Sequence, residues 1–411
     1  MLSVQEAQNQ IVSHFKPLDT TLVLLEQSLG YVLADSIRAG QDLPSFDNSS
    51  MDGFAVHAND VSAADQNDPV ILKVIADIPA GSAINISLNQ GQAARIMTGA
   101  AIPTGSDAVV MLENTDAYQQ ITGVAPPASV AVYKSIRTGE NIRKRGSDIH
   151  GGQEILLSGS ILRPQEIGML AMLGIAQVPV HRKPKIVIVA SGDELLPPGA
   201  NLAPGKIYDS NTFTLAALAQ NAGCDVIRLG VAPDRYDAIL DILARAVENQ
   251  PDMIISSAGI SVGVFDYVKD VVQSAGALYF WKVNMRPGKP LAFGNFRDIP
   301  FFGLPGNPVS SFISFLLFVQ PAIERLRGVR LSTNKRIRVF LTEAIESDGR
   351  ESYLRAIVKH ENGKYQGSLT GHQGSSNLNS LVQANALLII PSGVKSCPPG
   401  SELDAWSLEN L

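Results

Sequence analysis

The pattern of apolar and polar positions near the start of the sequence is helical. Apolar residues recur at helical spacing over residues 4–15, and Ser3 and Glu6 have the spacing of a capping box. A second helical piece is expected over residues 22–29, because Gly30 suits the position that follows a helix. Residues 1–30 are therefore predicted to be largely helical.

The next part of the chain has the pattern of short strands. Short apolar runs separated by Gly, Pro and Asn fill residues 54–133, as at 70–75 and 108–112, which is typical of a small β-rich domain. Helical spacing returns near Pro164, which suits a first helical turn. The pattern predicts a β-rich unit inserted between two helical pieces. Residues 42–53, rich in Gly, Pro and Asp, are predicted to lack regular structure.

From about Lys183 onward, apolar runs that suit buried strands alternate with helical segments. The predicted strands are 186–190, 226–231, 253–255, 280–281 and 301–302. The predicted helices are 213–222, 239–247, 267–274 and 310–326. This alternation predicts a doubly wound α/β domain with an open parallel sheet. After Gly328 short strands return at 337–341, 353–358 and 387–390, which predicts a small all-β domain.

Composition and charge exclude several classes of protein. The 411 residues carry a net charge of −6. This charge argues against a protein that coats nucleic acid, because such proteins have an excess of Lys and Arg. Cys224 and Cys397 are far apart and are expected to be reduced thiols rather than a disulfide or zinc site. The most apolar segment, 312–319, is too short to span a bilayer, and residues 1–6 lack a signal-peptide pattern. We expect a cytoplasmic protein that binds neither nucleic acid nor membrane.

Candidate chemistry lies in the loops that follow the predicted strands. In an open parallel sheet, ligands bind outside the carboxyl ends of the strands. Polar loops follow three predicted strands, at 191–194, 256–263 and 303–310, and their backbone N–H groups could hold an anion. Each loop alone is more simply a tight turn, but three on one edge favour a phosphate-rich ligand. None has a Walker or GxGxxG pattern, so ordinary nucleotide-binding motifs are excluded.

Charged residues near the same edge suggest a metal and an oxyanion. Asp193, Glu194 and Asp234 could hold a divalent cation beside phosphates, or they could be solvated charges and helix caps. The segment from Arg286 to Pro290 contains two cations, Arg286 and Lys289. Its prolines stiffen the loop, so both side chains can be directed at an oxyanion. The cluster Arg143 to Arg145 is either a second binding group or a solvated turn. No nucleophile–base arrangement stands out, so we expect positioning and charge neutralisation rather than a covalent intermediate.

Several segments, in this order, are specific for one family. They are FDNSSMDGFAV (46–56), RIMTGA (95–100), GENIR (139–143), SGDEL (191–195), YDSN (208–211), SVG (261–263), FWKV (280–283), PGKP (287–290) and GLPGNPVS (303–310). On these residues the chain resembles the MoeA-type molybdopterin molybdenumtransferases over nearly its whole length. Relatives of that family form the E domains of gephyrin and of plant cofactor-assembly proteins.

The resemblance implies a homodimer of four-domain subunits. It implies a helical, elongated dimerisation domain at 1–45 and 140–178 and an inserted β-rich domain at 46–139. It also implies an α/β, MogA-like domain that binds molybdopterin at 179–328 and a small C-terminal β-barrel at 329–411. In this family the active cleft lies between subunits, so Asp52 and Thr98 would face the partner's α/β domain.

The resemblance also implies roles for individual residues. The implied catalytic residues are Asp52, Thr98, Glu194, Asp234, Asp266 and Lys289, with Glu194 and Asp234 as magnesium ligands. The implied substrate-binding residues are Arg143, Asp148, Ser191, Gly192, Ser261, Gly263, Arg286, Pro305, Gly306, Asn307, Pro308, Ser375 and Ser376. The implied reaction inserts molybdate into adenylylated molybdopterin, with Mg²⁺ and with release of AMP. A molybdopterin adenylyltransferase and molybdoenzyme maturation proteins are the implied partners.

Three departures from the usual family pattern leave alternatives open. Ala258 stands where family members commonly have Gly, Arg286 where they often have Lys, and Ser191 where Thr is common. Arg and Lys are not equivalent donors, so a tungstate-using paralogue is an alternative. A gephyrin-like scaffold is a second alternative, although the acids at 52, 194, 234 and 266 are all present. An adenylyltransferase is a third, against which the flanking domains argue.

Overall fold

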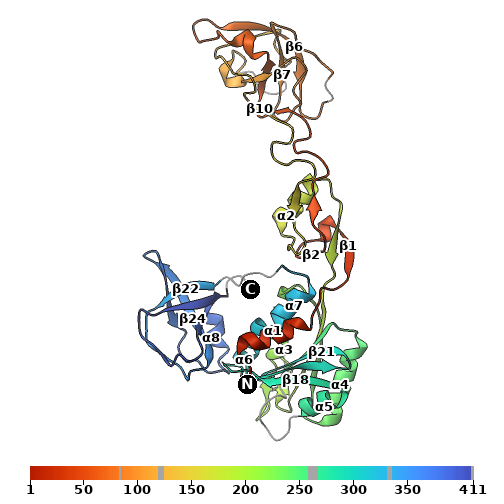
Figure 1. Ribbon diagram of the computed structural model, residues 1–411, viewed down its shortest axis with the longest axis vertical. Helices are drawn as coiled ribbons and strands as arrows, with labels where there is room; N and C mark the ends of the chain where they lie inside the picture. Colours follow the sequence, from red (N-terminus) through yellow and green to blue (C-terminus); the bar gives the residue numbers. More distant parts are fainter. Residues whose placement is uncertain (83–84, 119–124, 258–266, 331–335, 409–411) are drawn as a thin grey trace. The chain divides into compact units, whose positions relative to one another are not determined.

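A computed structural model describes residues 1–82, 85–118, 125–257, 267–330 and 336–408 of the chain. The chain forms two compact units, which Figure 1 draws coloured along the sequence. The first unit comprises Met1–Asp35, Ser158–Ala171 and Ile175–Leu411. The second comprises Ser36–Leu157 and Met172–Gly174, so it is an insertion in the sequence of the first.

A six-stranded sheet in the order β16-β13-β17-β21-β20-β18 forms the centre of the first unit. Its parallel strands are β16 (Asp225–Ala232), β13 (Lys185–Ser191), β17 (Met253–Ser257) and β21 (Ile299–Leu304). Two antiparallel strands, β20 (Pro290–Phe296) and β18 (Gly276–Lys282), extend it beyond β21. The predicted α/β domain is confirmed, but the sheet is mixed rather than wholly parallel.

Strand β20, which lies between the predicted strands at 280–281 and 301–302, was not identified from the sequence. Its residues hid it: Pro290, Gly294 and Asn295 are all types that strands usually avoid. Gly294 is required by the pairing itself, since a Cβ there would lie 2.0 Å from the carbonyl oxygen of Ala277 in β18. A glycine that weakens a strand pattern in the sequence thus permits close approach of two backbones.

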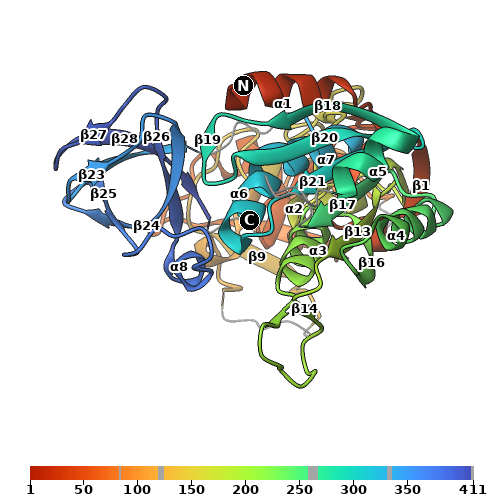
Figure 2. The same ribbon diagram turned by 90° about the horizontal axis from the view of Figure 1, so that it is seen from below.

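Helices cover both faces of this sheet (Figure 2). On one face, α4 (Tyr236–Glu248) and α5 (Tyr267–Ala275) pack through residues such as Leu243 and Val271. On the other face lie α1 (Val4–Ser13), α3 (Asn211–Asn221) and the helix that begins at Pro308. Because alternate residues of β13 point to opposite faces, its near-continuous apolar run serves both cores.

The helix after β21 is interrupted by one wider turn. It consists of α6 (Pro308–Ser314), a π turn (Phe315–Val319) and α7 (Gln320–Leu326). Pro321 has no N–H to offer the carbonyl of Leu317 in the α-helical pattern, and Gln8 Nε2 of α1 donates to that carbonyl at 2.8 Å. Over the described residues, 308–326 is one helix long and apolar enough to cross a membrane, and 72% of its apolar window is buried.

The remaining small elements of the first unit include one correction to the sequence prediction. The α1 capping box is present, since Ser3 and Glu6 bond reciprocally to each other's backbone N–H groups. The helix expected at 22–29 is instead strand β1 (Thr20–Leu24) followed by a single 3₁₀ turn. β1 pairs with β12 (Gln177–His181), and this tertiary pairing overrides the local helical preference.

The second unit contains a five-stranded sheet in the order β8-β5-β7-β6-β9. Its strands are β5 (Gly53–Val56), β6 (Val70–Ile78), β7 (Gln92–Ile96), β8 (Ala108–Met111) and β9 (Ser129–Val132), and they confirm the predicted β-rich unit. The loop at 42–53 is not wholly irregular as predicted, because β4 (Asn48–Ser49) pairs with β10 (Ile142–Arg143). A second short pair joins β3 (Ile37–Arg38) to β11 (Glu154–Leu156).

The C-terminal strands close into a five-stranded barrel, which confirms the predicted small β domain. Its strands are β22 (Arg336–Leu341), β24 (Glu351–Glu361), β25 (Lys364–Leu369), β26 (Ala386–Ile390) and β28 (Glu402–Ser407). A short strand from the α/β domain, β19 (Met285–Arg286), pairs with β24 on the outside of the barrel. The segment around Arg286 is therefore fixed to both domains.

Candidate functional site

The carboxyl ends of the parallel strands meet at one edge of the α/β sheet. The strand order reverses between β13 and β17, and ligands of doubly wound sheets bind at such a point. β13 ends there at Ser191, whose buried Oγ has no hydrogen-bond partner among the described residues. Asn211, at the start of α3, donates from Nδ2 to Ser257 Oγ at 2.9 Å and to the carbonyl of Gly306 at 2.8 Å.

Asn211 is thus a link between two of the predicted loops and the end of β17. Its Oδ1 is buried and, like Ser191 Oγ, lacks a partner within the described part of the chain. Unsatisfied buried polar atoms are costly, so two of them at one strand edge indicate a place where a ligand supplies the missing hydrogen bonds. Sequence reasoning placed Asn211 in a family motif but assigned it no role.

The predicted acids lie around the neighbouring loop. Gly192 approaches the Glu194 carboxylate so closely that a Cβ on it would lie 2.8 Å from Glu194 Oε2. Asp193 Oδ1 accepts a hydrogen bond of 3.3 Å from the backbone N–H of Asp234, which joins the ends of β13 and β16. A cavity of about 430 Å³ beside them is lined by Gly192, Asp193, Leu195, Pro197, Asp209, Phe213, Arg228, Gly230, Val231, Ala232 and Pro233.

These acids fit Mg²⁺ only with help from a ligand. Over the described residues, no group of three His, Cys, Asp or Glu side chains is gathered in a metal-binding arrangement. Mg²⁺ is commonly held by one or two carboxylates together with substrate phosphates and water, so a site with few carboxylates is compatible with it, and Glu194 and Asp234 stay its predicted ligands. The predicted residues Asp266, Ser261 and Gly263, and the departure at Ala258, lie outside the described residues.

The third predicted loop, at 303–310, contacts the barrel. Pro305 is buried, Asn307 is the cap of α6, and Pro308 occupies the first turn of that helix. The backbone N–H of Val309 donates to the carbonyl of Ser375 at 3.1 Å, which brings a predicted barrel residue to this helix. Ser376, the next predicted residue, is exposed.

A basic pocket of about 320 Å³ lies where this loop meets the barrel. Its walls come from both domains: Arg286, Pro287, Gly288, Lys289, Pro290, Asn307, Ser310, Arg350, Leu354, Arg355, Gln373, Gly374 and Ser375. The structure therefore brings the predicted Arg286, Lys289, Asn307 and Ser375 together. We call Arg286, Lys289, Arg350 and Arg355 the basic cluster.

Arg355 is the buried member of the basic cluster, with no exposed surface. Its Nε donates to Ser380 Oγ at 3.0 Å and its Nη2 to the carbonyl of Gly374 at 2.9 Å. Burial, and secondarily the charge of Arg286, lowers the pKa of Arg355 to about 10, so the guanidinium stays charged at neutral pH. Both hydrogen-bond partners are neutral, so the positive charge is left to attract an anion in the pocket.

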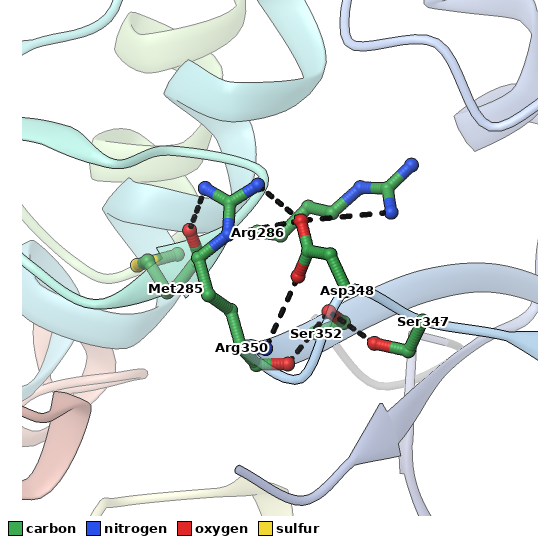
Figure 3. Close-up of polar contacts among 6 residues, drawn as sticks. All are labelled: Met285, Arg286, Ser347, Asp348, Arg350 and Ser352. Carbon is green, nitrogen blue, oxygen red and sulfur yellow. Dashed lines mark hydrogen bonds and ion pairs between the residues drawn. The ribbon is translucent and has the colours of Figure 1, made fainter. Parts of the chain in front are cut away.

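Arg350 is anchored by Asp348 at the seam between the domains (Figure 3). Its Nε donates to Asp348 Oδ2 at 3.0 Å, its Nη2 is also bonded to that oxygen, and its Nη1 donates to the carbonyl of Met285 at 3.2 Å. Hydrogen bonds from Arg350, with a smaller effect of the Arg286 charge, lower the pKa of Asp348 to about 2. Sequence reasoning missed Arg350 and Arg355, although an arginine inside the apolar run 353–358 was a signal.

In the second unit the structure joins two other predicted residues. Asp52 Oδ1 accepts hydrogen bonds of 2.7 Å from both the backbone N–H and the Oγ1 of Thr98. The carboxylate is therefore held by the loop of the RIMTGA segment. Among the described residues, its second oxygen accepts no hydrogen bond.

The loop at 42–53 is tied down by the basic segment that follows Ile142. Lys144 Nζ lies 2.8 Å from Asp47, Arg145 Nε lies 2.6 Å from Asp42, and Arg143 pairs with Asp148. Backbone N–H groups contribute most to lowering the pKa of the Asp42 and Asp47 carboxyls, and these cations add to it. The segment 143–145 thus acts in holding the loop, and Arg143 and Asp148 neutralise each other.

Three family models match the chain in sequence order. The "MoeA N-terminal region (domain I and II)" matches residues 2–174, the "Probable molybdopterin binding domain" 187–325, and the "MoeA C-terminal region (domain IV)" 338–408. Molybdopterin molybdenumtransferase 2 of Mycobacterium tuberculosis H37Rv is 38% identical, over 99% of this chain and 100% of its own length. The chain belongs to the molybdopterin molybdenumtransferase (MoeA) family.

Other relatives agree with this assignment. Molybdopterin molybdenumtransferase of Bacillus subtilis is 36% identical over 97% of this chain and 92% of its own length. The crystal structure of a molybdopterin biosynthesis MoeA protein from Pyrococcus horikoshii OT3 is 30% identical, covers 99% of this chain and 100% of that chain, and gives a TM-score of 0.81. The predicted family, multi-domain fold and enzyme class are confirmed. The predicted domain boundaries and site roles stay predictions.

Proposed function

We propose that this MoeA-family chain inserts molybdate into adenylylated molybdopterin and releases AMP in a Mg²⁺-dependent reaction. The proposal rests on the basic cluster and on a strand edge where two buried polar atoms lack a partner among the described residues, in a chain whose relatives are named molybdopterin molybdenumtransferases. The two features suit the two substrates: a dianionic oxyanion, and a nucleotide with phosphates. The cleaved bond is the phosphoanhydride, and molybdenum is left on the two dithiolene sulfurs.

The strand edge is the proposed nucleotide side. Backbone N–H groups at 191–193, and at the start of α6 around Asn307, can donate to phosphate oxygens. Mg²⁺, held by Glu194 and Asp234 together with the phosphates, would offset their charge during cleavage. The buried Ser191 Oγ and Asn211 Oδ1 would gain hydrogen bonds from the same ligand.

The basic cluster is the proposed molybdate side. Guanidinium groups present several N–H donors in a fixed plane, which suits a tetrahedral oxyanion better than a single ammonium does. Lys289 adds a mobile charge, and Ser310 and Ser375 add hydroxyl groups to the wall. Donors fixed before the ligand arrives stabilise developing charge without reorganisation, which is the contribution expected of this pocket.

The proposal extends to assembly and location. We expect a cytoplasmic homodimer in which Asp52 and Thr98 of one subunit serve the α/β domain of its partner, as the family resemblance implies. A molybdopterin adenylyltransferase is the expected supplier of substrate, and molybdoenzyme maturation proteins are the expected recipients of product.

The deciding experiment measures AMP release from adenylylated molybdopterin by the full-length protein, with Mg²⁺ and with or without molybdate. Molybdate-dependent AMP release, with molybdenum retained on the pterin and activity abolished by EDTA, is the expected result. Tight binding of the nucleotide without turnover would instead support a scaffold. Equal turnover with tungstate would support the paralogue alternative that Arg286 raises.

A further inference from the structure

A carboxylate that the proposed role does not call for lies beside the basic cluster. Asp348 lies beside Arg286 and Arg350, two of the four cations of the pocket (Figure 3). A negative charge at this place opposes binding of an oxyanion in the neighbouring pocket, because like charges repel. The Asp348 side chain is 38% exposed, so solvent weakens this electrostatic repulsion but does not abolish it.

Asp348 engages its two arginines unequally. Arg350 is held closely, through its backbone N–H at 3.1 Å, its Nε at 3.0 Å and its Nη2. Arg286 is held loosely, with its Nη1 3.9 Å from Asp348 Oδ2, beyond hydrogen-bond distance. Arg350 has a further anchor in the carbonyl of Met285, whereas the side chain of Arg286 is 44% exposed.

Arg286 therefore has room to change partners and Arg350 does not. Arg286 lines both the basic pocket and a smaller cavity of about 110 Å³ that also contains Glu346, Ser347 and Ser352. It stands between the proposed oxyanion position and the segment that carries Asp348. An oxyanion that draws Arg286 toward it must compete with the Asp348 carboxylate for the same guanidinium.

We infer that Asp348 is a built-in counter-ion that limits the oxyanion affinity of the basic cluster by competing for Arg286. The inference rests on the proposed function, since it assumes that this pocket takes the oxyanion. Asp348 is a positioning residue in this scheme, because it acts through Arg286 and Arg350. Its negative charge raises the dissociation constant of the pocket for the oxyanion. Its hydrogen bonds to Arg350 keep that guanidinium in place.

The test is Asp348→Asn, which removes the charge and keeps the oxygen that accepts from the backbone N–H of Arg350. Titration calorimetry of sodium molybdate into the full-length protein should show a dissociation constant roughly three- to tenfold lower than that of the wild type. Tighter binding distinguishes a counter-ion from a merely structural residue, whose loss would weaken binding. Asp348→Ser tests the same point if the Asn variant does not fold.

Asp404→Asn is the matched control. Asp404 also pairs with two arginines of the barrel, Arg336 and Arg338, and its side chain is 32% exposed. Unlike Asp348, it pairs with two arginines that are not members of the basic cluster, so its loss should leave molybdate binding unchanged.

The role of Arg286 is tested by repeating the Asp348 substitution in an Arg286→Met background. The gain in affinity should then fall to less than half of its original size, because the competing partner is gone. An equal gain in both backgrounds, or unchanged or weaker binding in Asp348→Asn, overturns the inference. Absence of molybdate binding and of AMP release in the wild type overturns the proposed function instead.

Discussion

At the scale of single residues, the most unusual group is the Arg355 guanidinium. It lies in the buried, mainly apolar stretch of β24, where a charge costs free energy unless its N–H donors are hydrogen-bonded. Its contacts hold Gly374 and Ser380, which flank the loop that contributes Ser375 to the pocket. Arg355 therefore supplies charge to the pocket and also fixes one of its walls.

Replacing Arg355 with Met should damage both roles. We expect the free energy of unfolding of the barrel to fall by about 1–3 kcal/mol, because the Gly374 carbonyl loses its partner. We also expect the KM for molybdate to rise about tenfold, because a charge-assisted donor array is lost. Thermal unfolding and molybdate-dependent AMP release measure the two effects.

Arg338→Met is the comparison variant for this prediction. Arg338 lies in the same barrel, is 67% exposed and pairs with Asp404 at 3.2 Å. Surface pairs of this kind contribute little, so stability and KM should stay near wild type. If Arg355→Met behaved like Arg338→Met, the buried guanidinium would have no special role.

At the scale of elements, the sequence predicted best where the signal was local. The capping box at Ser3 and Glu6 and the apolar run of β13 depend on neighbouring residues, and both predictions are confirmed. The failures at 22–29 and at β20 have the opposite cause. β1 exists because β12 pairs with it, and β20 because β18 and β21 flank it, so no local pattern reveals either.

At the same scale, one polar contact adds to the apolar packing that holds α1 to the long helix. Gln8 of α1 bonds the carbonyl of Leu317, in the stretch where Pro321 supplies no N–H. Gln8→Leu should lower the free energy of unfolding by about 1 kcal/mol, because a partly buried carbonyl loses its donor. Denaturant-induced unfolding measures this loss.

Gln5→Leu gives the matched reference on the same helix. Among the described residues, Gln5 Nε2 bonds Asn9 Oδ1 alone, in an exposed i,i+4 pair at 2.9 Å. Such pairs contribute a few tenths of a kcal/mol, so this variant should be nearly as stable as wild type. Equal losses in the two variants would mean that helix propensity, and not the Leu317 contact, is responsible.

At the scale of the whole molecule, the predicted site residues come from both compact units. Asp52 and Thr98 belong to one, and Glu194, Asp234 and Lys289 to the other. The sequence could identify these residues because each lies in or near a short motif of neighbouring residues. The structure describes the surroundings of each residue within its own unit. That Asp52 of one subunit acts with the α/β domain of its partner was predicted only from the family resemblance. The spacing of residues along one chain carries no information about contacts between subunits.

Mixing two inactive variants tests the predicted sharing of the site between subunits. Asp52→Ala and Glu194→Ala should each be inactive alone, whereas a mixed dimer should recover one intact site. Subunit exchange at random then gives about a quarter of wild-type AMP release, because half of the dimers are mixed and each has one working site of two. A mixture as inactive as its components would show that both residues act within one subunit.

The short strand β19 has a consequence for how the molecule holds together. It adds a piece of the α/β domain to the outside of the barrel, and the basic cluster draws Arg286 and Lys289 from one side of this joint and Arg350 and Arg355 from the other. Like charges on the two sides oppose the joint, and an anion bound between them offsets their repulsion. An oxyanion that contacts both domains also stabilises the interface between them. Binding of the oxyanion and association of the two domains are therefore thermodynamically linked.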